Sequence, residues 1–419
     1  MKRRLRFLWP WLALAAVFAL APKVFSSGTA LTMMSVMGVM IIFALSYNML
    51  LGQTGLLSFG HAVYYGLGGF VAIHAMNAVI HGKLGVPVAI MPIVGGLAGL
   101  AFGVLFGLVS VRRAGLVFSM ISLGIGELVS SSSFILRTFF GGEEGITTNR
   151  AQLAPLFGLR FGPQIEVYYL IAIWCFLCIA AMYALTRTPF GRICNAVREN
   201  PERVQYIGYS AQRIRLIAFS FAAFFAGIAG ALAAINFEIM NAQQLGAGQS
   251  AVVLLMTYIG GVGYFAGPIL GAVIITFLQI NLSDLTNAWQ LYFGLMFIGV
   301  VSFAPGGVAR WLMRHWEAAR SGEFRRLAPT YAFVAPGLAA GLIGAAMLIE
   351  LANRQLALAR SEGSAMNLFG FAVDASSIAP WAAALALFAG GVATTWRLWP
   401  KVDDAWGSVN AGLRAKGRA

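Results

Sequence analysis

Residues 86–110 read VPVAIMPIVGGLAGLAFGVLFGLVS, a run without a single charged side chain. Because an α-helix rises about 1.5 Å per residue, such a run can cross the roughly 30 Å of hydrocarbon in a bilayer. Similar runs recur along the 419 residues, so that 59% of the positions are apolar and only 11% are charged. Typical soluble domains are about 45 to 50% apolar and about 25% charged. The sequence therefore excludes a soluble or disordered protein and predicts an all-α, polytopic integral membrane protein.

Twelve apolar runs are candidate membrane helices, about ten in a core and two more near the C-terminus. The first run resembles a signal peptide, but Pro22 directly follows the small residues at 19–21, so we expect a retained helix. The two runs between 250 and 283 are short and glycine-rich where they meet, which leaves two spans or a re-entrant pair as alternatives. The twelve runs are 7–25, 30–51, 60–80, 86–110, 115–136, 166–186, 214–235, 250–265, 267–283, 289–304, 331–350 and 379–396.

The distribution of basic residues predicts the orientation of the chain. If the N-terminus is cytoplasmic and every candidate crosses, 22 of the 29 lysines and arginines fall on the inside. Cytoplasmic loops carry such an excess as a rule, so we expect both termini in the cytoplasm. The net charge of +14 then reports membrane orientation and gives no reason to expect a nucleic-acid partner. The seven residues on the outside are Lys23, Lys83, Arg137, Arg150, Arg160, Arg354 and Arg360.

The longest inside segment, residues 187–213, contains signals for a short helix. Asn200 can cap a helix, Pro201 suits its first position, and Gly208 suits the left-handed residue after its end. A helix of about seven residues is marginal alone in water, so it needs packing against something else. It is either a cytoplasmic element that docks into a partner protein or a surface helix that rests on the bundle.

Residues 46–69 place polar side chains among glycines at membrane depth. This composition favours a broken or closely packed helix, and discontinuous helices expose polar groups to substrates in transporters. The segment either lines a substrate pathway or packs against neighbouring helices through satisfied hydrogen bonds, which is the commoner role for a lone histidine such as His61. The candidate pathway residues are Ser46, Tyr47, Asn48, Gln53, Thr54, Ser58 and His61.

Glu127 is the one acidic residue well inside an apolar run. A carboxylate at that depth costs several kcal/mol unless it faces a cavity or a partner. Gly124, Ser130 and Ser131 lie three or four residues away and therefore share its helix face. Glu127 either lines the substrate route, where it could meet the ammonium group of an amino acid, or makes a buried structural hydrogen bond. In an alternative function, an ion-coupled secondary transporter, it would be the proton or sodium site.

The sequence gives no sign of an enzyme, a metal centre or an ATP site. The four histidines form no His-Glu-x-x-His pattern, and no lysine lies in Gly-x-x-x-x-Gly-Lys-Ser/Thr. Three cysteines provide no disulfide framework. We therefore expect no catalytic residues, no metal and no cofactor in this chain, and if ATP drives it, a separate subunit must bind the nucleotide. The cysteines are Cys175, Cys178 and Cys194.

Several segments, in order along residues 30–310, resemble the permeases of branched-chain amino acid ABC importers of the LivM type. The strongest is FGRICNAVRENPE at 190–202, which resembles the coupling loop of these permeases, although Arg203-Val-Gln205 stands where importer coupling loops carry Glu-Ala-Ala. The others are ALSYNMLLGQTGLLSFGHA at 44–62, GLGG at 66–69, GGEEG at 141–145, YIG at 206–208, AFSFAAFFAGIAGAL at 218–232, GGVG at 260–263, GP at 267–268 and FAPGG at 303–307.

This resemblance implies a permease subunit of the bacterial inner membrane that translocates branched-chain amino acids or a related small polar solute. It implies a LivH-type second permease, two ABC ATPase subunits that bind ATP and Mg²⁺, and a periplasmic substrate-binding protein. The acidic residues of the outside loop 141–149 leave three alternatives: the loop contacts the binding protein, it gates the outer mouth, or it is a solvated surface loop. Residues 1–326 would form the permease core, and 327–419 a C-terminal extension without a counterpart in the family. The residues expected to couple to the ATPase are Gly191, Arg192, Arg198, Glu199, Asn200, Pro201, Glu202, Arg203 and Gly208.

Overall fold

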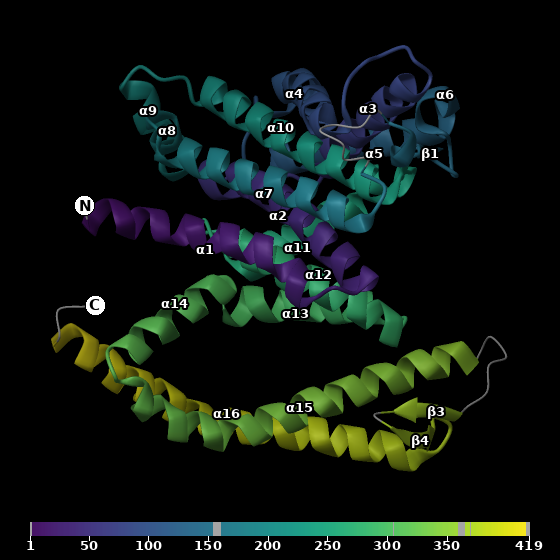
Figure 1. The fold of residues 1–419 in the computed structure, drawn as a ribbon. Coiled ribbons are helices and arrows are strands. Elements are labelled where there is room, and N and C mark those ends of the chain that lie inside the picture. Colours follow the sequence, from purple (N-terminus) through teal and green to yellow (C-terminus); the bar gives the residue numbers. More distant parts are fainter. Residues whose placement is uncertain (1, 154–160, 305, 359–364, 369, 416–419) are drawn as a thin grey trace. The chain divides into compact units, whose positions relative to one another are not determined.

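A computed structural model describes residues 2–153, 161–304, 306–358, 365–368 and 370–415. Within these ranges the chain forms sixteen α-helices and two small two-stranded sheets, which confirms the all-α class (Figure 1). Five residues on which the sequence predictions rest lie outside the described ranges: Arg160 and Arg360 of the seven outside residues, Lys416 and Arg418 of the 22 inside ones, and Pro305.

The chain divides into two compact units, residues 1–280 with 299–309, and residues 281–298 with 310–419. Helices α12 (Gly267–Leu285) and α13 (Trp289–Phe303) contribute to both. The other helices of the first unit are α1 (Lys2–Val24), α2 (Gly28–Thr54), α3 (Ala62–Ile80), α4 (Met91–Ser110), α5 (Leu116–Ile135), α6 (Arg137–Phe140), α7 (Gln164–Arg187), α8 (Pro189–Glu199), α9 (Pro201–Tyr206), α10 (Ala211–Phe237) and α11 (Ala247–Gly260). Three short 3-10 helices, η1 (Val88–Ile90), η2 (Arg150–Gln152) and η3 (Ala242–Leu245), and the strands β1 (Ile146–Thr147) and β2 (Ile239–Met240) complete it.

Each of the twelve predicted runs contains a helix in the structure. Among the described residues, nine helices are long and apolar enough to cross a membrane, and α13 with α14 (Gly307–Arg320) makes a tenth candidate as a bent pair. The apolar part of α1, from Trp9 to Val24, and α11 are shorter than a span. The chain is thus a multi-pass membrane protein. Of the two runs between 250 and 283, the second forms α12, which is long enough to span, and the first forms α11, which is not. Two spans or a re-entrant pair therefore stay open only for α11.

Helix α10 is the centre of the first unit, because it packs against α2, α3 and α4. Its glycines make this possible: a Cβ on Gly227 would collide with the backbone of Gly95 on α4, and one on Gly230 with the carbonyl of Tyr65 on α3. Small residues allow helix backbones to approach closely inside a membrane, where packing drives association. The glycine-rich composition is therefore used for contact between helices.

The second unit contains a long helical hairpin. Helices α15 (Phe324–Leu358) and α16 (Ile378–Ala415) lie side by side, and the short strands β3 (Ala365–Leu368) and β4 (Phe371–Asp374) pair between them (Figure 1). Ala318 of α14 belongs to the same buried cluster as Leu327 and Trp406 of the hairpin. The boundary at residue 326 between core and extension stays a prediction.

Residues predicted on the same side of the membrane contact one another. Tyr168 Oη donates to the Phe18 carbonyl at 2.9 Å, and Trp174 Nε1 to that of Ala89 at 3.0 Å, and all four residues lie in the predicted outer halves of their runs. The Arg198 side chain donates to the Gly52 carbonyl, both at a predicted inner end. The alternation of the passes is therefore consistent with the structure, and the assignment of the inner end to the cytoplasm stays a prediction.

Candidate functional site

The predicted break near residues 46–69 is confirmed, since α2 ends at Thr54 and α3 begins at Ala62. Gly55 ends α2 in the left-handed conformation with φ 71°, and its amide donates to the Leu51 carbonyl at 3.1 Å. The connecting segment is bound to α2 by Tyr47, whose hydroxyl donates to the Ser58 carbonyl at 2.9 Å. The break is thus an ordered turn inside the protein.

His61 lies in an aromatic enclosure at this break. Its ring stacks on Phe43 with centroids 5.6 Å apart and meets the edge of Tyr47 at 5.3 Å. Ser46 Oγ donates its only proton to the Phe43 carbonyl at 2.7 Å. His61 Nε2 lies 3.0 Å from Ser46 Oγ, so Nε2 must be the donor in the hydrogen bond between His61 and Ser46. His61 Nδ1 is then an acceptor, and it has no hydrogen-bond partner among the described residues.

Most of the predicted pathway residues of α2 and the break are buried within the chain. Three more buried polar atoms there also lack a partner among the described residues: Asn48 Oδ1, Gln53 Oε1 and Ser58 Oγ. Thr54 bonds its own helix, its hydroxyl donating to the Leu50 carbonyl at 2.6 Å. Buried polar groups are costly without a partner, so these unpaired atoms mark a polar interior next to the break. Their role in a substrate pathway stays a prediction.

Helix α5 shows two different faces. Its inner face binds the break: Ser119 Oγ donates to the Leu57 carbonyl at 2.7 Å, and Ser122 Oγ accepts from the Phe59 amide at 3.1 Å. Glu127 lies on the outer face, where it is exposed together with Gly124 and Ser131. Gly124 and Ser131 therefore share the helix face of Glu127, as predicted, while Ser130 is half-buried.

The predicted short helix after Asn200 is confirmed as α9. Asn200 Oδ1 accepts from the Arg203 amide at 2.9 Å, Pro201 is the first helical residue, and Gly208 has φ 88°. Helix α8 was not predicted, although its cap Thr188 and the following Pro189 give the same kind of start signal. The loop is therefore a helical pair, and we call α8 and α9 the coupling element after their predicted role, which stays a prediction.

The coupling element packs by an apolar face and exposes a polar one. Cys194, Val197 and Val204 are buried against the start of α10. Burial raises the pKa of the Cys194 thiol to about 12, so it is neutral and unreactive. The exposed side contains the predicted coupling residues Arg192, Glu199, Asn200, Glu202, Arg203 and Gly208, with Arg198 on its rim, whereas Gly191 is buried and Pro201 half-buried.

Three exposed side chains at the end of the coupling element were not predicted as site residues. Tyr206 is 89% exposed and Ile207 65%, and Tyr209 is exposed beside them. Large apolar side chains in a short polar segment between spans are the signal that could have identified them. An exposed apolar group rimmed by charges is typical of a protein interface.

Arg198 connects the coupling element to the broken helix. Its guanidinium donates to the carbonyl of Gly52, one of the last carbonyls of α2, which have no partner within the helix. Its aliphatic part lies against Gly55, at the first residue of the break. A cation at a helix C-terminus also interacts favourably with the helix dipole. The coupling element therefore holds the end of α2 through one side chain.

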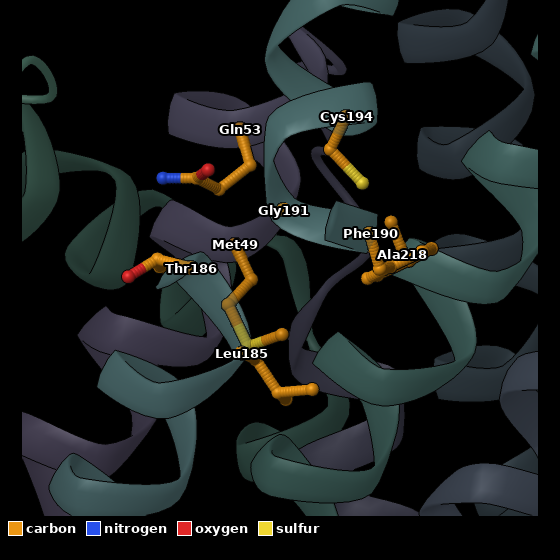
Figure 2. Close-up of a pocket in the computed structure, with 8 residues that line it drawn as sticks. All are labelled: Met49, Gln53, Leu185, Thr186, Phe190, Gly191, Cys194 and Ala218. Carbon is orange, nitrogen blue, oxygen red and sulfur yellow. The ribbon is translucent and has the colours of Figure 1, made fainter. Parts of the chain in front are cut away.

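A small cavity lies beside this connection. Figure 2 shows it between α2, α7, α8 and α10. Its volume of about 10 Å³ has room for roughly one water molecule, which excludes it as a substrate site. Gln53 lines this cavity, and its predicted role in the pathway stays a prediction. The other lining residues are Met49, Leu185, Thr186, Phe190, Gly191, Cys194 and Ala218.

The acidic loop at the opposite end is held by the ends of α3 and α10. Strand β1 pairs with β2, the Asn77 side chain donates to the Thr147 carbonyl at 3.0 Å, and Glu143 and Glu144 stay exposed. Next to it Arg150, only 9% exposed, donates to the carbonyls of Ile235 and Asn236 at 2.9 Å each. These contacts present two carboxylates on a fixed turn.

Comparison with known proteins identifies the family. A profile of the branched-chain amino acid transport system / permease component matches residues 29–303, about two thirds of the chain. The chain belongs to this family. Among the described residues no group of three or more His, Cys, Asp or Glu side chains could hold a metal ion. The family is one of ABC transporter permeases of the inner membrane, which are not enzymes in themselves, and the comparisons give no support to an ion-coupled carrier.

Individual relatives of the permease come from several organisms. It is 27% identical to the high-affinity branched-chain amino acid transport system permease protein LivM of Escherichia coli, over 64% of this chain and 67% of that protein. A probable LivM of Methanocaldococcus jannaschii is 24% identical over 65% and 90%. The fructose import permease protein FrcC of Rhizobium meliloti is 23% identical over 58% and 69%. No solved structure matches the permease significantly.

Proposed function

We propose that this permease translocates branched-chain amino acids, or a related small polar solute, as one subunit of an ABC importer. The names of its LivM relatives support branched-chain amino acids as the substrate class. A sugar permease is also among the relatives, so the proposal includes other small polar solutes. The observation that carries the proposal is the bond from Arg198 to Gly52, because it links the exposed coupling element to the break in the membrane helices.

In this proposal the power source is in other chains. The permease sequence contains no Gly-x-x-x-x-Gly-Lys-Ser/Thr, so ATP and Mg²⁺ bind to two partner ATPase subunits. These contact the exposed charges of the coupling element and the apolar group of Tyr206, Ile207 and Tyr209. A movement of the coupling element is transmitted through Arg198 to α2.

The exposed face of α5 is where the pathway runs. A carboxylate such as Glu127 is expensive against lipid, and the described residues of the first unit leave it exposed. A second, LivH-type permease packed opposite α5 would enclose Glu127 in a polar channel between the two chains. There the carboxylate attracts the ammonium group of an amino acid, while Gly124 and Ser131 leave room for the solute.

The acidic loop is the proposed docking point for a periplasmic substrate-binding protein. Glu143 and Glu144 are exposed on a turn fixed by β1 and β2. Complementary charge speeds the encounter of two proteins and is screened by salt. Docking should therefore weaken as the ionic strength rises.

The test is purification of the tagged permease from its host, followed by uptake measurements in proteoliposomes. We expect a second permease and ATPases to co-purify, and leucine uptake to require ATP and the binding protein. Glu127→Gln should lower uptake at least tenfold with assembly intact. Purification of the permease alone, in a form that transports leucine on an ion gradient without ATP, would contradict the importer. Wild-type uptake in Glu127→Gln and Glu127→Leu would remove Glu127 from the pathway and leave the importer standing.

A further inference from the structure

Helix α14 differs in composition from the apolar helices α13 and α15 on either side of it. It follows α13 and precedes α15, and its sequence GVARWLMRHWEAAR alternates aromatic, aliphatic and basic residues. Three arginines, Arg310, Arg314 and Arg320, stand against one acid, Glu317. A helix with separate apolar and basic faces is typical of segments that lie in the surface of a bilayer.

The inner face of α14 is fixed by the hairpin. Ala318 is fully buried between α15 and α16. His315 Nδ1 lies 2.8 Å from the Trp311 carbonyl, so it carries a proton, and Nε2 lies 2.8 Å from the hydroxyl of Tyr331. That hydroxyl also accepts from Trp406 Nε1 at 3.0 Å. These bonds set the rotation of α14 about its own axis.

The opposite face is apolar and exposed. Leu312 is 47% exposed, Met313 46% and Trp316 68%, and their spacing of three and four residues puts them on one side of the helix. Ala318 lies at least about 120° around the helix from all three residues and is buried against the hairpin, so this face points away from the hairpin. Because α14 directly precedes the membrane helix α15, the bilayer surface is an apolar medium within its reach, and tryptophan is enriched there.

The arginines beside this face match the chemistry of phosphate groups. Arg310 and Arg320 are exposed, and Arg314 stacks on the Trp406 ring with Cζ 3.8 Å from its centroid, which fixes its orientation. A planar guanidinium binds phosphate oxygens through two parallel hydrogen bonds. We propose that α14 lies in the membrane surface, with Leu312, Met313 and Trp316 among the lipid headgroups and its arginines bound to anionic phospholipids. This proposal does not depend on the transported solute or on the partner subunits.

The native cysteines make a labelling test of the full chain possible. Cys175, Cys178 and Cys194 are at most 2% exposed, so a polar maleimide reaches mainly a cysteine introduced on the surface. Trp316→Cys places a dye on the apolar face, and the matched Glu317→Cys places it one residue further, on the polar flank. Both are reconstituted in nanodiscs of phosphatidylcholine, with and without phosphatidylglycerol, and the accessibility of an NBD dye to aqueous dithionite is measured.

We expect the dye at 316 to be protected and the dye at 317 to react freely, with stronger protection when phosphatidylglycerol is present. Arg310→Gln with Arg320→Gln should remove that gain, since each arginine near an anionic surface contributes a factor of about five. Equal reactivity at 316 and 317 would overturn the proposal. So would protection that is the same in both lipids, or protection that appears only after partner subunits are added, which would assign the face to a protein. Leu312→Cys repeats the test with Trp316 in place.

Discussion

The bundle around α10 and the hairpin of α15 and α16 are both long apolar helices, but their surfaces meet different surroundings. In the most apolar stretch of α10, 78% of the residues are buried within the protein, whereas in α16 the share is 11%. Apolar residues in α10 are interleaved with glycines that touch other helices, and those of α16 mostly face outward. Hydropathy alone is therefore a poor guide to which membrane helices form a protein core.

The largest difference is expected from adding volume at a glycine in each region. Gly230→Leu forces a side chain into the carbonyl of Tyr65, whereas Gly390→Leu on α16 meets nothing within 4 Å. We expect Gly230→Leu to lose about 3 kcal/mol or more and to give no monodisperse protein in detergent. Gly390→Leu should behave as wild type in the same size-exclusion assay. Equal yields of the two variants would show that both regions are packed alike.

A second contrast concerns buried and exposed arginines. Arg150→Ala leaves the carbonyls of Ile235 and Asn236 without their donor, at a cost of about 3 kcal/mol. Arg397 is exposed on the hairpin, and Arg397→Ala should change stability by less than about 0.5 kcal/mol. Thermal unfolding in detergent measures both. The contrast fails if the two midpoints fall by the same amount.

A functional contrast tests Arg198. Arg198→Ala removes the bond to Gly52 and should lower ATP-driven uptake about tenfold, which corresponds to about 1.4 kcal/mol, while assembly and ATP hydrolysis persist. Arg198→Lys keeps the charge without the planar fork and should recover part of the uptake. Uptake in Arg198→Ala at the wild-type level, with normal assembly, would show that α2 is not driven through this contact.

The smallest effect is expected at the cap of α9. Asn200→Ala removes the acceptor for the Arg203 amide and should destabilise this helix by about 1 kcal/mol, while Asn200→Asp keeps the acceptor. Hydrogen exchange of residues 201–207 should therefore rise about fivefold in the alanine variant alone. The long helices of the hairpin, which do not depend on a single cap, should exchange as before. Unchanged exchange in the alanine variant would show that packing of Val204 holds α9 without its cap.

Most features that depend on neighbouring residues in the chain were predicted from the sequence, whereas features that depend on contacts between distant residues were not. The positions of twelve apolar helices, an interruption within residues 46–69 and the cap at Asn200 follow from local residue types, and the structure confirms them. Helix α8 was not predicted, although its cap Thr188 and the following Pro189 give a start signal of the same kind as Asn200 and Pro201. The exposure of Glu127 could not be predicted from the sequence, because the other residues of α5 would allow either face of this helix to be buried.

The sequence by itself determined that the chain is a multi-pass membrane permease, because the length of apolar runs is set by the bilayer and family motifs are local. Only the tertiary structure decided that Arg198 reaches Gly52, 146 positions away, that His61 lies among aromatic rings, and that Glu127 faces outward. These depend on which helix packs beside which, and on its rotation. Interhelical packing sets both, through contacts between residues far apart in the chain.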